Sequence, residues 1–341
     1  MSDEPPPVSP AGAPARLATI AERAGVSPAT VSRVLNHRPG VAARTRITVE
    51  KAIAELNLSR STGDELVIVV APELSNEVFA LLAGQLTAEF GRFGMHTMIS
   101  AIVPGTSNER DLADLVLRTG AAGVVFLSSG NTPFEQPRTA QQAMAQRRMP
   151  FVGVNGTAAG ITAPVFSTDD RYGAELAIDH LHRLGHRHIG ILTGPPGNPS
   201  AEHRLDGLRE ALRTRGLDDH DARVERQLPT VEGGRHGTGR LIEQGVTAVV
   251  AAGDRLALGA ADAAERHGLR IPADLSLVAH EDAALLERTA PPLTAIRQPT
   301  EKLAGHAAQA LRMLLLGAAP PPGGLLIQPE LRIRRSTAAA P

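Results

Sequence analysis

Residues 25–36 carry the clearest chemistry in this chain; they read Gly-Val-Ser-Pro-Ala-Thr-Val-Ser-Arg-Val-Leu-Asn. Ser27 can accept hydrogen bonds as the N-cap of a helix, and Pro28 fits the first helical position, where its missing N–H costs nothing. The apolar positions that follow recur at helical spacing: Val31, Val34 and Leu35. The segment therefore predicts a short helix with one buried side.

The opposite side of this short helix presents small polar groups and one guanidinium. Such side chains can contact phosphates and the edges of DNA bases. The positions on this side are Ala29, Thr30, Ser32, Arg33 and Asn36.

Two further helices are predicted around this polar surface. A short apolar-periodic segment precedes Gly25, which predicts a tight turn between a first helix and the polar-faced one. A third helix is expected over 43–57, with one apolar and one basic side. Three short helices of this kind, with a glycine turn between the first two, predict a helix-turn-helix.

Charge supports an interaction with DNA. Residues 16–60 hold eight basic and three acidic side chains, a net charge of +5, whereas residues 61–341 carry −4. A basic head on an acidic body is typical of a DNA-binding module. The alternative interpretation is a three-helix protein-interaction domain whose charges only solvate it.

The whole chain has 341 residues, which fits a small domain followed by a two-lobed one. It contains no apolar run long enough to span a membrane, so no membrane partner is expected. Residues 1–15 are rich in Pro and Ala and lack the pattern of a signal peptide, so we expect a disordered tail. The chain has no cysteine, which fits a reducing cytoplasm.

Beyond residue 65, short apolar runs alternate with longer amphipathic segments. This alternation predicts βαβ units and parallel sheets with helices on both faces. The expected strands are 66–70, 97–103, 123–127, 151–155, 189–193, 248–252 and 275–279. The expected helices are 77–93, 109–119, 138–148, 172–184, 204–215, 233–244, 256–267 and 300–316. The length favours two similar lobes, with ligands bound outside the strand ends.

The chain resembles the LacI/GalR family of bacterial transcription regulators. The head matches through AGVSPATVSRVLN (24–36), and the body matches through an ordered set of motifs. These are DDRYGAELAIDHLHRLGHRHIGILTGP (169–195), RLDGLREAL (204–212), VEGG (231–234), GDRLALGA (253–260), GLRIPADLSLV (268–278) and PPLTAIRQP (291–299). The resemblance implies an all-α helix-turn-helix DNA-binding head and an α/β two-lobed, periplasmic-binding-protein-like (type I) core with parallel sheets.

The resemblance also implies a domain layout with three crossovers between the lobes, expected near 164–166, 290–292 and 324–326. The expected parts are a disordered tail (1–15), the DNA-binding domain (16–57), a short linker (58–65), the effector-binding core (66–336) and a C-terminal tail (337–341). Within the core we expect lobe 1 at about 66–164 and 292–324, and lobe 2 at about 165–291 and 325–336.

The chain departs from the family pattern in two places. The family usually has Thr where Arg16 stands, so the first helix lacks a preferred N-cap. The linker before Thr62 and Gly63 is about seven residues shorter than usual. We therefore expect no hinge helix, and no leucine inserted into the minor groove at the operator centre.

For the head, the resemblance implies phosphate contacts by some residues and contacts with base edges by others, Arg33 being the candidate for a bidentate contact to guanine. The DNA-binding candidates are Ser27, Pro28, Ala29, Thr30, Ser32, Arg33, Asn36 and His37.

For the core, the resemblance implies effector contacts from loops at the strand ends. Arg204 is the strongest candidate, because its guanidinium can bind hydroxyls or a carboxylate. Capping of the following helix is an equal alternative for Asp254. The effector-binding candidates are Ser75, Asn76, Phe79, Asn155, Asn198, Ser200, Arg204, Asp254 and Glu281, with Pro229 and Gly253 beside them.

The composition of the expected cleft limits its ligand. His280 and Glu281 stand where the family mostly has an aromatic residue and Asp, and the chain has one Tyr and no Trp. The cleft therefore lacks the flat rings that often stack on sugars. A small polar or acidic ligand is possible, although family precedent puts sugars first.

Two other patterns do not support a cofactor or metal. Residues 194–200 are glycine- and proline-rich but lack the lysine of a phosphate-binding loop. His180 and His182 are two apart on a helix, so their side chains point away from each other, and His186 and His188 flank a strand start. We expect neither a metal nor a cofactor.

The sequence thus predicts a cytoplasmic, homodimeric, effector-responsive transcription regulator, favouring a repressor, and not an enzyme. It would bind double-stranded DNA at a pseudo-palindromic operator and a small effector, with a carbohydrate favoured. The alternatives are a solute-binding protein of the same core fold and a sugar or nucleotide enzyme on a doubly wound sheet. The basic head argues against the first, and the lack of a recognisable catalytic constellation argues against the second.

Overall fold

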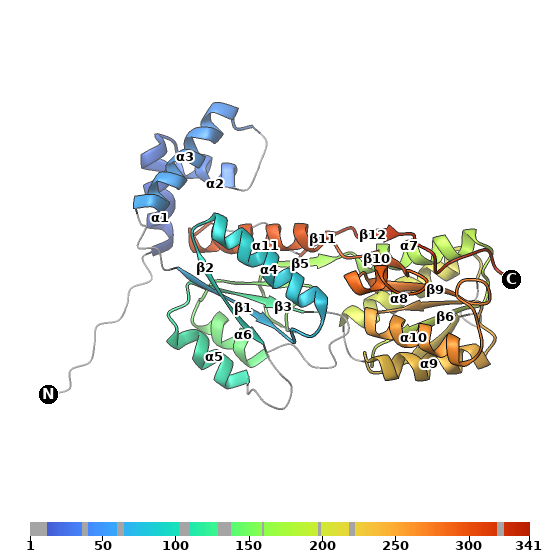
Figure 1. Cartoon of the computed structure of the whole chain (residues 1–341). Coiled ribbons are helices and arrows are strands. Elements are labelled where there is room, and N and C mark those ends of the chain that lie inside the picture. The colour runs from blue at the N-terminus through green and yellow to red at the C-terminus, as the bar shows by residue number, and fades with distance from the viewer. Residues whose placement is uncertain are drawn as a thin grey trace.

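The computed structural model describes residues 12–35, 40–59, 65–101, 109–128, 138–158, 160–196, 199–217, 222–318 and 324–341. They form a small helical head and two α/β lobes (Figure 1). Among these residues, no helix has both the length and the apolar character that crossing a membrane requires.

The head consists of three helices around one apolar cluster. They are α1 (Gly12–Ala24), α2 (Pro28–Leu35) and α3 (Ala43–Ser59). Val31, Val34 and Leu35 of α2 are buried, as the periodicity predicted. The helix-turn-helix is therefore confirmed.

The bounds of the head differ from the sequence prediction at both ends. Helix α1 begins at Gly12, so residues 12–15 are helical, and Arg16 lies inside the helix instead of at its N-cap. Helix α3 continues to Ser59 and takes up the first two residues of the expected linker. Residues 60–64, and with them the prediction of a linker without a hinge helix, lie outside the described residues. The same is true of residues 1–11 of the expected disordered tail.

Lobe 1 is built on a six-stranded parallel sheet in the order β11-β5-β4-β3-β1-β2. Helices α4 and α11 pack on one face, in the cluster that includes Phe79 and Leu311, and α5 and α6 pack on the other. The strands are β1 (Leu66–Ala71), β2 (His96–Ala101), β3 (Gly123–Leu127), β4 (Phe151–Val154), β5 (Val165–Thr168) and β11 (Gly324–Ile327). The helices are α4 (Glu77–Arg92), α5 (Glu109–Arg118), α6 (Arg138–Gln146) and α11 (Thr300–Leu315).

Lobe 2 has a second six-stranded sheet in the order β12-β10-β9-β8-β6-β7, parallel except for the β10–β12 pair. Helices α7 and α8 cover one face, and α9 and α10 the other. The strands are β6 (Ile189–Thr193), β7 (Ala222–Arg226), β8 (Ala248–Ala251), β9 (Ser276–Glu281), β10 (Thr294–Arg297) and β12 (Glu330–Arg332). The helices are α7 (Asp170–Arg183), α8 (Pro199–Thr214), α9 (Val231–Glu243), α10 (Asp254–Arg266) and the 3₁₀ turn η1 (Ala284–Glu287).

The chain crosses between the lobes three times, and each crossover lies a few residues later than predicted. Strands β5 and β11 pair with each other in the sheet of lobe 1, and β10 pairs with β9 in lobe 2. The crossovers therefore follow Thr168, Arg297 and Ile327. The expected lobe boundaries at 164, 292 and 324 are corrected accordingly.

A small hydrogen-bond network ties two of these crossovers together. The side-chain carbonyl of Gln298 accepts from Asn155 Nδ2 at 3.3 Å and from Thr168 Oγ1 at 3.2 Å. Asn155 Oδ1 accepts in turn from the Thr168 backbone N–H. Asn155 thus holds the connection between the lobes.

The C-terminal segment, expected as a tail at 337–341, packs against lobe 2. Ala340 N donates to the Leu184 carbonyl, and His180 Nε2 lies 2.9 Å from Thr337 Oγ1. His186 is buried between Thr247 Oγ1 at 2.9 Å and the Ala338 carbonyl at 3.1 Å. Two of the four histidines singled out in the sequence thus anchor the C-terminal segment.

Candidate DNA-binding face and effector cavity

The polar side of α2 is accessible on the head. Ser27 caps the helix, with its Oγ accepting from the Thr30 backbone N–H at 3.1 Å. Gly25 makes the turn before it with a φ of 65°, a conformation that favours glycine. The candidates Ser27, Pro28, Ala29 and Arg33 are exposed, and Thr30 and Ser32 are half-buried. Asn36 and His37 lie outside the described residues.

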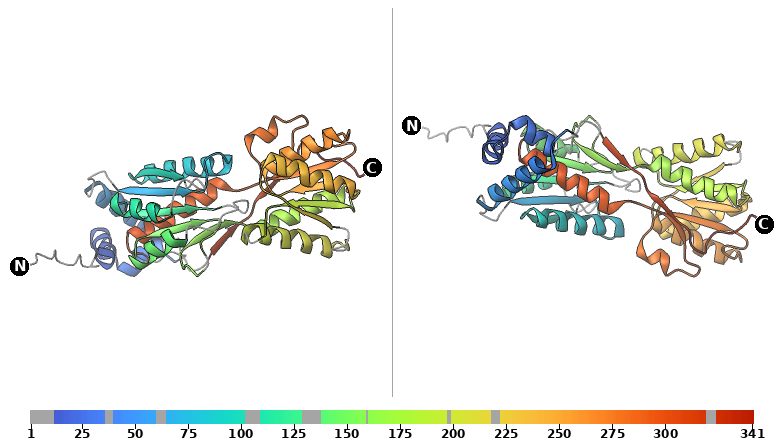
Figure 2. Two further views of the ribbon diagram at one scale, coloured as in Figure 1. Left: turned by 90° about the horizontal axis from the view of Figure 1, so that it is seen from below. Right: turned by 90° about the horizontal axis from the view of Figure 1, so that it is seen from above.

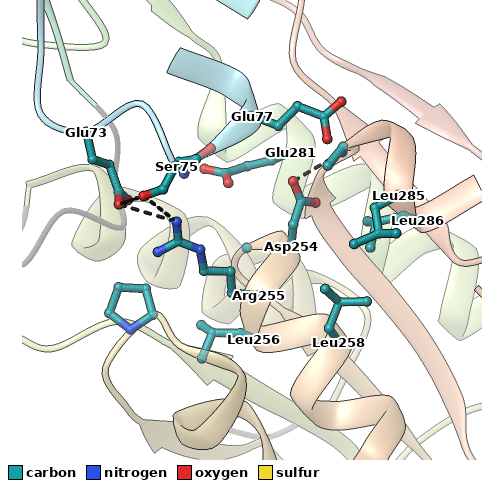
Figure 3. Close-up of a pocket in the computed structure, with 14 residues that line it drawn as sticks. Glu73, Ser75, Glu77, Asp254, Arg255, Leu256, Leu258, Glu281, Leu285 and Leu286 are labelled. Carbon is teal, nitrogen blue, oxygen red and sulfur yellow. Dashed lines mark hydrogen bonds and ion pairs between the residues drawn. The ribbon is translucent and has the colours of Figure 1, made fainter. Parts of the chain in front are cut away.

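A cavity of about 260 Å³ lies between the two lobes, at the carboxyl ends of strands from both sheets (Figure 3). Lobe 1 contributes the loop after β1 and the start of α4, and lobe 2 contributes the loops after β7, β8 and β9. Parallel sheets offer ligand sites at this edge of their strands. The lining residues are Glu73, Ser75, Asn76, Glu77, Pro229, Gly253, Asp254, Arg255, Leu256, Leu258, Glu281, Ala283, Leu285 and Leu286.

The structure brings together six of the positions singled out in the sequence. Ser75 and Asn76 come from lobe 1, and the rest from lobe 2: Pro229, Gly253, Asp254 and Glu281. Asn76 also caps α4, because its Oδ1 accepts from the Val78 N–H at 3.0 Å.

Other effector candidates do not line this cavity. Phe79 is fully buried in the core of lobe 1, since α4 turns its apolar stripe inward. Asn155 belongs to the crossover network. Asn198 lies outside the described residues, as does the side chain of Ser200.

Arg204 lies behind the wall of the cavity and is only 3% exposed. Its guanidinium donates to Asp170 Oδ1 at 3.0 Å and to the Ala252 carbonyl at 2.8 Å. Ala252 directly precedes two lining residues, so Arg204 supports the wall in this structure. Burial, with Arg204 nearby, holds the pKa of His280 well below its usual range.

Asp254 organises the loop after β9. Its carboxylate accepts from the backbone N–H groups of Asp282 at 3.2 Å and Ala283 at 3.1 Å. Helix α10 begins at Asp254 and has no side-chain cap, so the helix-capping alternative is wrong. Burial, together with the carboxylate of Glu281, raises the pKa of Asp254 to about 8.

The bonds from Asp254 hold a strained backbone in place. Glu281 and Asp282 have φ values of 94° and 71°, in the left-handed region that side chains disfavour. The Asp282 carboxylate is fully buried and pairs with Arg297 at 2.7 Å and with Arg334 at 2.6 Å. Several bonds therefore hold this loop in its strained conformation, in which the Glu281 carboxylate lines the cavity.

Three polar contacts join the lobes across the cavity. Arg255 of α10 donates to Ser75 Oγ at 3.0 Å and to Glu73 Oε2 at 3.3 Å (Figure 3). Glu77 of α4 accepts from the Ala284 backbone N–H at 3.0 Å. We call these contacts the interlobe latch. The predicted effector residues did not include Glu73, Glu77 or Arg255, although each lies within two residues of one that was predicted.

Comparisons with known proteins agree with this architecture. Residues 16–61 match the model of bacterial regulatory proteins of the lacI family, and residues 178–337 match the periplasmic binding protein-like domain. The chain is 36% identical over 335 residues to the HTH-type transcriptional regulator MalR of Streptomyces coelicolor, covering 96% of this chain and 97% of that protein. It is 30% identical over 338 residues to the HTH-type transcriptional repressor CytR of Escherichia coli, covering 96% and 97%. The chain belongs to the LacI family.

Solved structures of the LacI family are similar over nearly the whole chain. The transcriptional regulator CelR–cellobiose complex has a TM-score of 0.72 at 26% identity, covering 94% of this chain and 99% of that one. The lac repressor dimer bound to operator and the anti-inducer ONPF has a TM-score of 0.70 at 27% identity, covering 98% and 100%. This LacI-family chain is a DNA-binding transcription regulator with an effector-binding core, and not an enzyme.

Proposed function

We propose that the chain is a homodimeric repressor that acts in the bacterial cytoplasm. Two copies of α2 would contact the half-sites of a pseudo-palindromic operator, because a two-fold symmetric protein favours a two-fold symmetric site. The repressor name of CytR and the operator-bound lac repressor dimer support this proposal.

The effector fits best as a neutral carbohydrate bound in the interlobe cavity. Four carboxylic side chains line it (Glu73, Glu77, Asp254 and Glu281), and Arg255, the one cation among the described lining residues, is already paired with Glu73. Even with Asp254 protonated, the lining holds more carboxylates than cations, so an anionic ligand would meet an excess of negative charge, which is costly at a half-buried site. Carboxylates and Asn76 suit hydroxyl donors, and four leucines offer apolar surface to sugar C–H groups.

The excess of carboxylates favours a neutral effector over the acidic ligand that the sequence also allowed. None of the cavity-lining residues in the described part of the chain is aromatic. Recognition would therefore rest on hydrogen bonds and not on ring stacking. The cellobiose bound to CelR shows that a related core accepts a neutral disaccharide.

One observation carries this proposal: the same chain has an exposed polar recognition helix and a carboxylate-lined cavity between two lobes. Footprinting on the DNA upstream of the chain's own gene tests the first half. A thermal-shift series with cellobiose, its aldonic acid and other neutral sugars tests the second. We expect neutral sugars to raise the melting temperature and to change the footprint. A larger shift with the acid than with any neutral sugar would contradict the proposed effector class.

A further inference from the structure

The last turn of α11 carries apolar side chains that do not belong to the core of its own lobe. Leu311 and Leu315 pack in the main cluster of lobe 1. Met313 is 2% exposed and Ala318 is 3% exposed, yet both belong to the apolar cluster of the head. Leu316 packs against that cluster as well. The end of α11 therefore contacts both lobe 1 and the head.

Helical geometry explains this division. Leu311 and Leu315 are four residues apart and share one side of the helix, whereas Met313 lies about 200° around the axis from Leu311. Leu316, three residues after Met313, shares its side. One side of the last turn is thus turned toward lobe 1 and the other toward the head.

The C-terminal cap of α11 completes the contact with the head. Gly317 has a φ of 75°, and its N–H donates to the Leu314 carbonyl at 3.0 Å. Ala318 N donates to the Met313 carbonyl at 2.9 Å. This pair of bonds is a Schellman motif, which brings the residue after the glycine back beside the last turn. Ala318 is thereby set next to Met313.

This turn is fixed to lobe 1 by more than its two leucines. The Arg312 guanidinium lies 4.4 Å from the ring centroid of Phe93, just beyond the end of α4. Burial lowers the pKa of Arg312. The surface that meets the head is consequently packed against lobe 1 on its other side.

The chain also restricts where the head can go. Helix α3 ends at Ser59, and only residues 60–64 separate it from Glu65, which directly precedes β1. A connection of this length spans roughly 20 Å at most when fully extended. Figure 1 shows the head above the end of α11, and the two views of Figure 2 show it at the same end of lobe 1.

We propose that the α11 dock (Met313, Leu316 and Ala318) holds the head as one body with lobe 1. Movement of lobe 1 would then reach the recognition helix directly through the dock. The dock couples the two parts through packed side chains and a short connection.

The dock can be tested without DNA or effector, because the chain has no cysteine. Cysteines introduced at Ile47 of the head, which is 64% exposed, and at exposed Arg118 of lobe 1 can carry spin labels. Labelled chains are diluted with unlabelled ones, so that each measured distance lies within one chain. We expect one narrow distance distribution in the parent protein.

Met313→Glu should broaden this distribution, because it places a charge in the apolar contact. Gln309→Glu is the matched control: it adds the same charge one turn earlier on the same side of α11, outside the head cluster. Ala318→Glu, which lies beyond the helix, serves as a second variant should Met313→Glu fail to fold by circular dichroism.

Loss of the narrow distance in the two dock variants, but not in Gln309→Glu, supports the proposal. A broad distribution in the parent, or a narrow one in a folded dock variant, overturns it. Neither result depends on the identity of the effector or the operator, so the proposed function stands or fails separately.

Discussion

Arg33 is the residue from which we expect sequence discrimination. It is exposed on the polar side of α2, and its guanidinium can donate two hydrogen bonds to one guanine. Arg33→Ala should therefore weaken binding to the operator by about 1–3 kcal/mol and leave the fold intact. Titrations against operator and random DNA check this. An equal loss on both would assign Arg33 to a phosphate contact.

The Asp254 carboxyl should make the stability of the protein depend on pH. Its folded-state pKa, raised to about 8, lies above the value in an unfolded chain. The folded state therefore binds the extra proton, and stability falls as pH rises from about 4 to about 8, by up to about 1.4 kcal/mol per unit.

The window between pH 7 and 8 isolates this effect. Burial lowers the pKa of His180, His186 and His280. Their contribution to the stability of the fold therefore rises with pH and becomes constant above about pH 6.5. Thermal melts of Asp254→Asn should lose the decline that the parent shows between pH 7 and 8. Parallel curves for parent and variant would contradict this.

Arg255 should restrain the lobes more than it stabilises the fold. Its side chain is 36% exposed, so its ion pair with Glu73 is screened and contributes less than about 1 kcal/mol. Arg255→Met should barely change the melting temperature but should speed hydrogen exchange in the 73–76 and 282–286 backbone. The control is Arg266→Met, because Arg266 pairs with Asp262 on the same helix. Identical exchange in the two variants would argue against the interlobe latch.

At the scale of elements, the sequence predicted every long helix of the core, because each spans several turns of a repeating apolar pattern. Five strands were not predicted: β5, β7, β10, β11 and β12. They contain three to five residues each, and their place is set by pairing with distant strands and not by local pattern. Because these strands were not predicted, the predicted crossovers lie a few residues before the observed ones.

The site followed the same logic. The family resemblance pointed to loops after strands and so to Ser75, Asp254 and Glu281, and the parallel sheets do bring these strand ends together. The burial of Phe79 and the pairing of Arg204 with Asp170 depend on which way a helix faces and on a partner 34 residues away. Neither can be obtained from spacing.

The C-terminal segment should act as a structural part of lobe 2. Because a carbonyl only accepts, His186 Nε2 is the donor to Ala338. Deletion of 337–341 would remove this bond together with the Ala340 N–H bond to Leu184 and the contact between Thr337 and His180. We expect a loss of roughly 1–3 kcal/mol of stability. Deletion of Pro341 alone is the control. Equal denaturation midpoints for the two truncations would show that the segment is dispensable.

At the scale of the molecule, the short connection and the α11 dock should make the protein strict about operator geometry. Heads held against lobe 1 cannot follow half-sites that are moved apart. One base pair inserted at the operator centre should therefore abolish most of the specific affinity. With no predicted hinge helix, the complex should also avoid a DNA-bending cost of about 1–6 kcal/mol. Retained affinity across several spacer lengths, or a sharply kinked central step, would contradict this.

The path of α11 has a consequence for how the protein is made. Seven side chains of this helix belong to the core of lobe 1, among them Leu303, Leu311 and Leu315. During translation, the head and most of lobe 1 are therefore synthesised long before α11, which completes the core of lobe 1 and contacts the head. During synthesis the finished head has no dock, and lobe 1 has one face uncovered. A chain that terminates before residue 300 would thus carry a DNA-binding head on an incompletely folded lobe 1. Such a chain would expose apolar surface and be a substrate for cellular proteases.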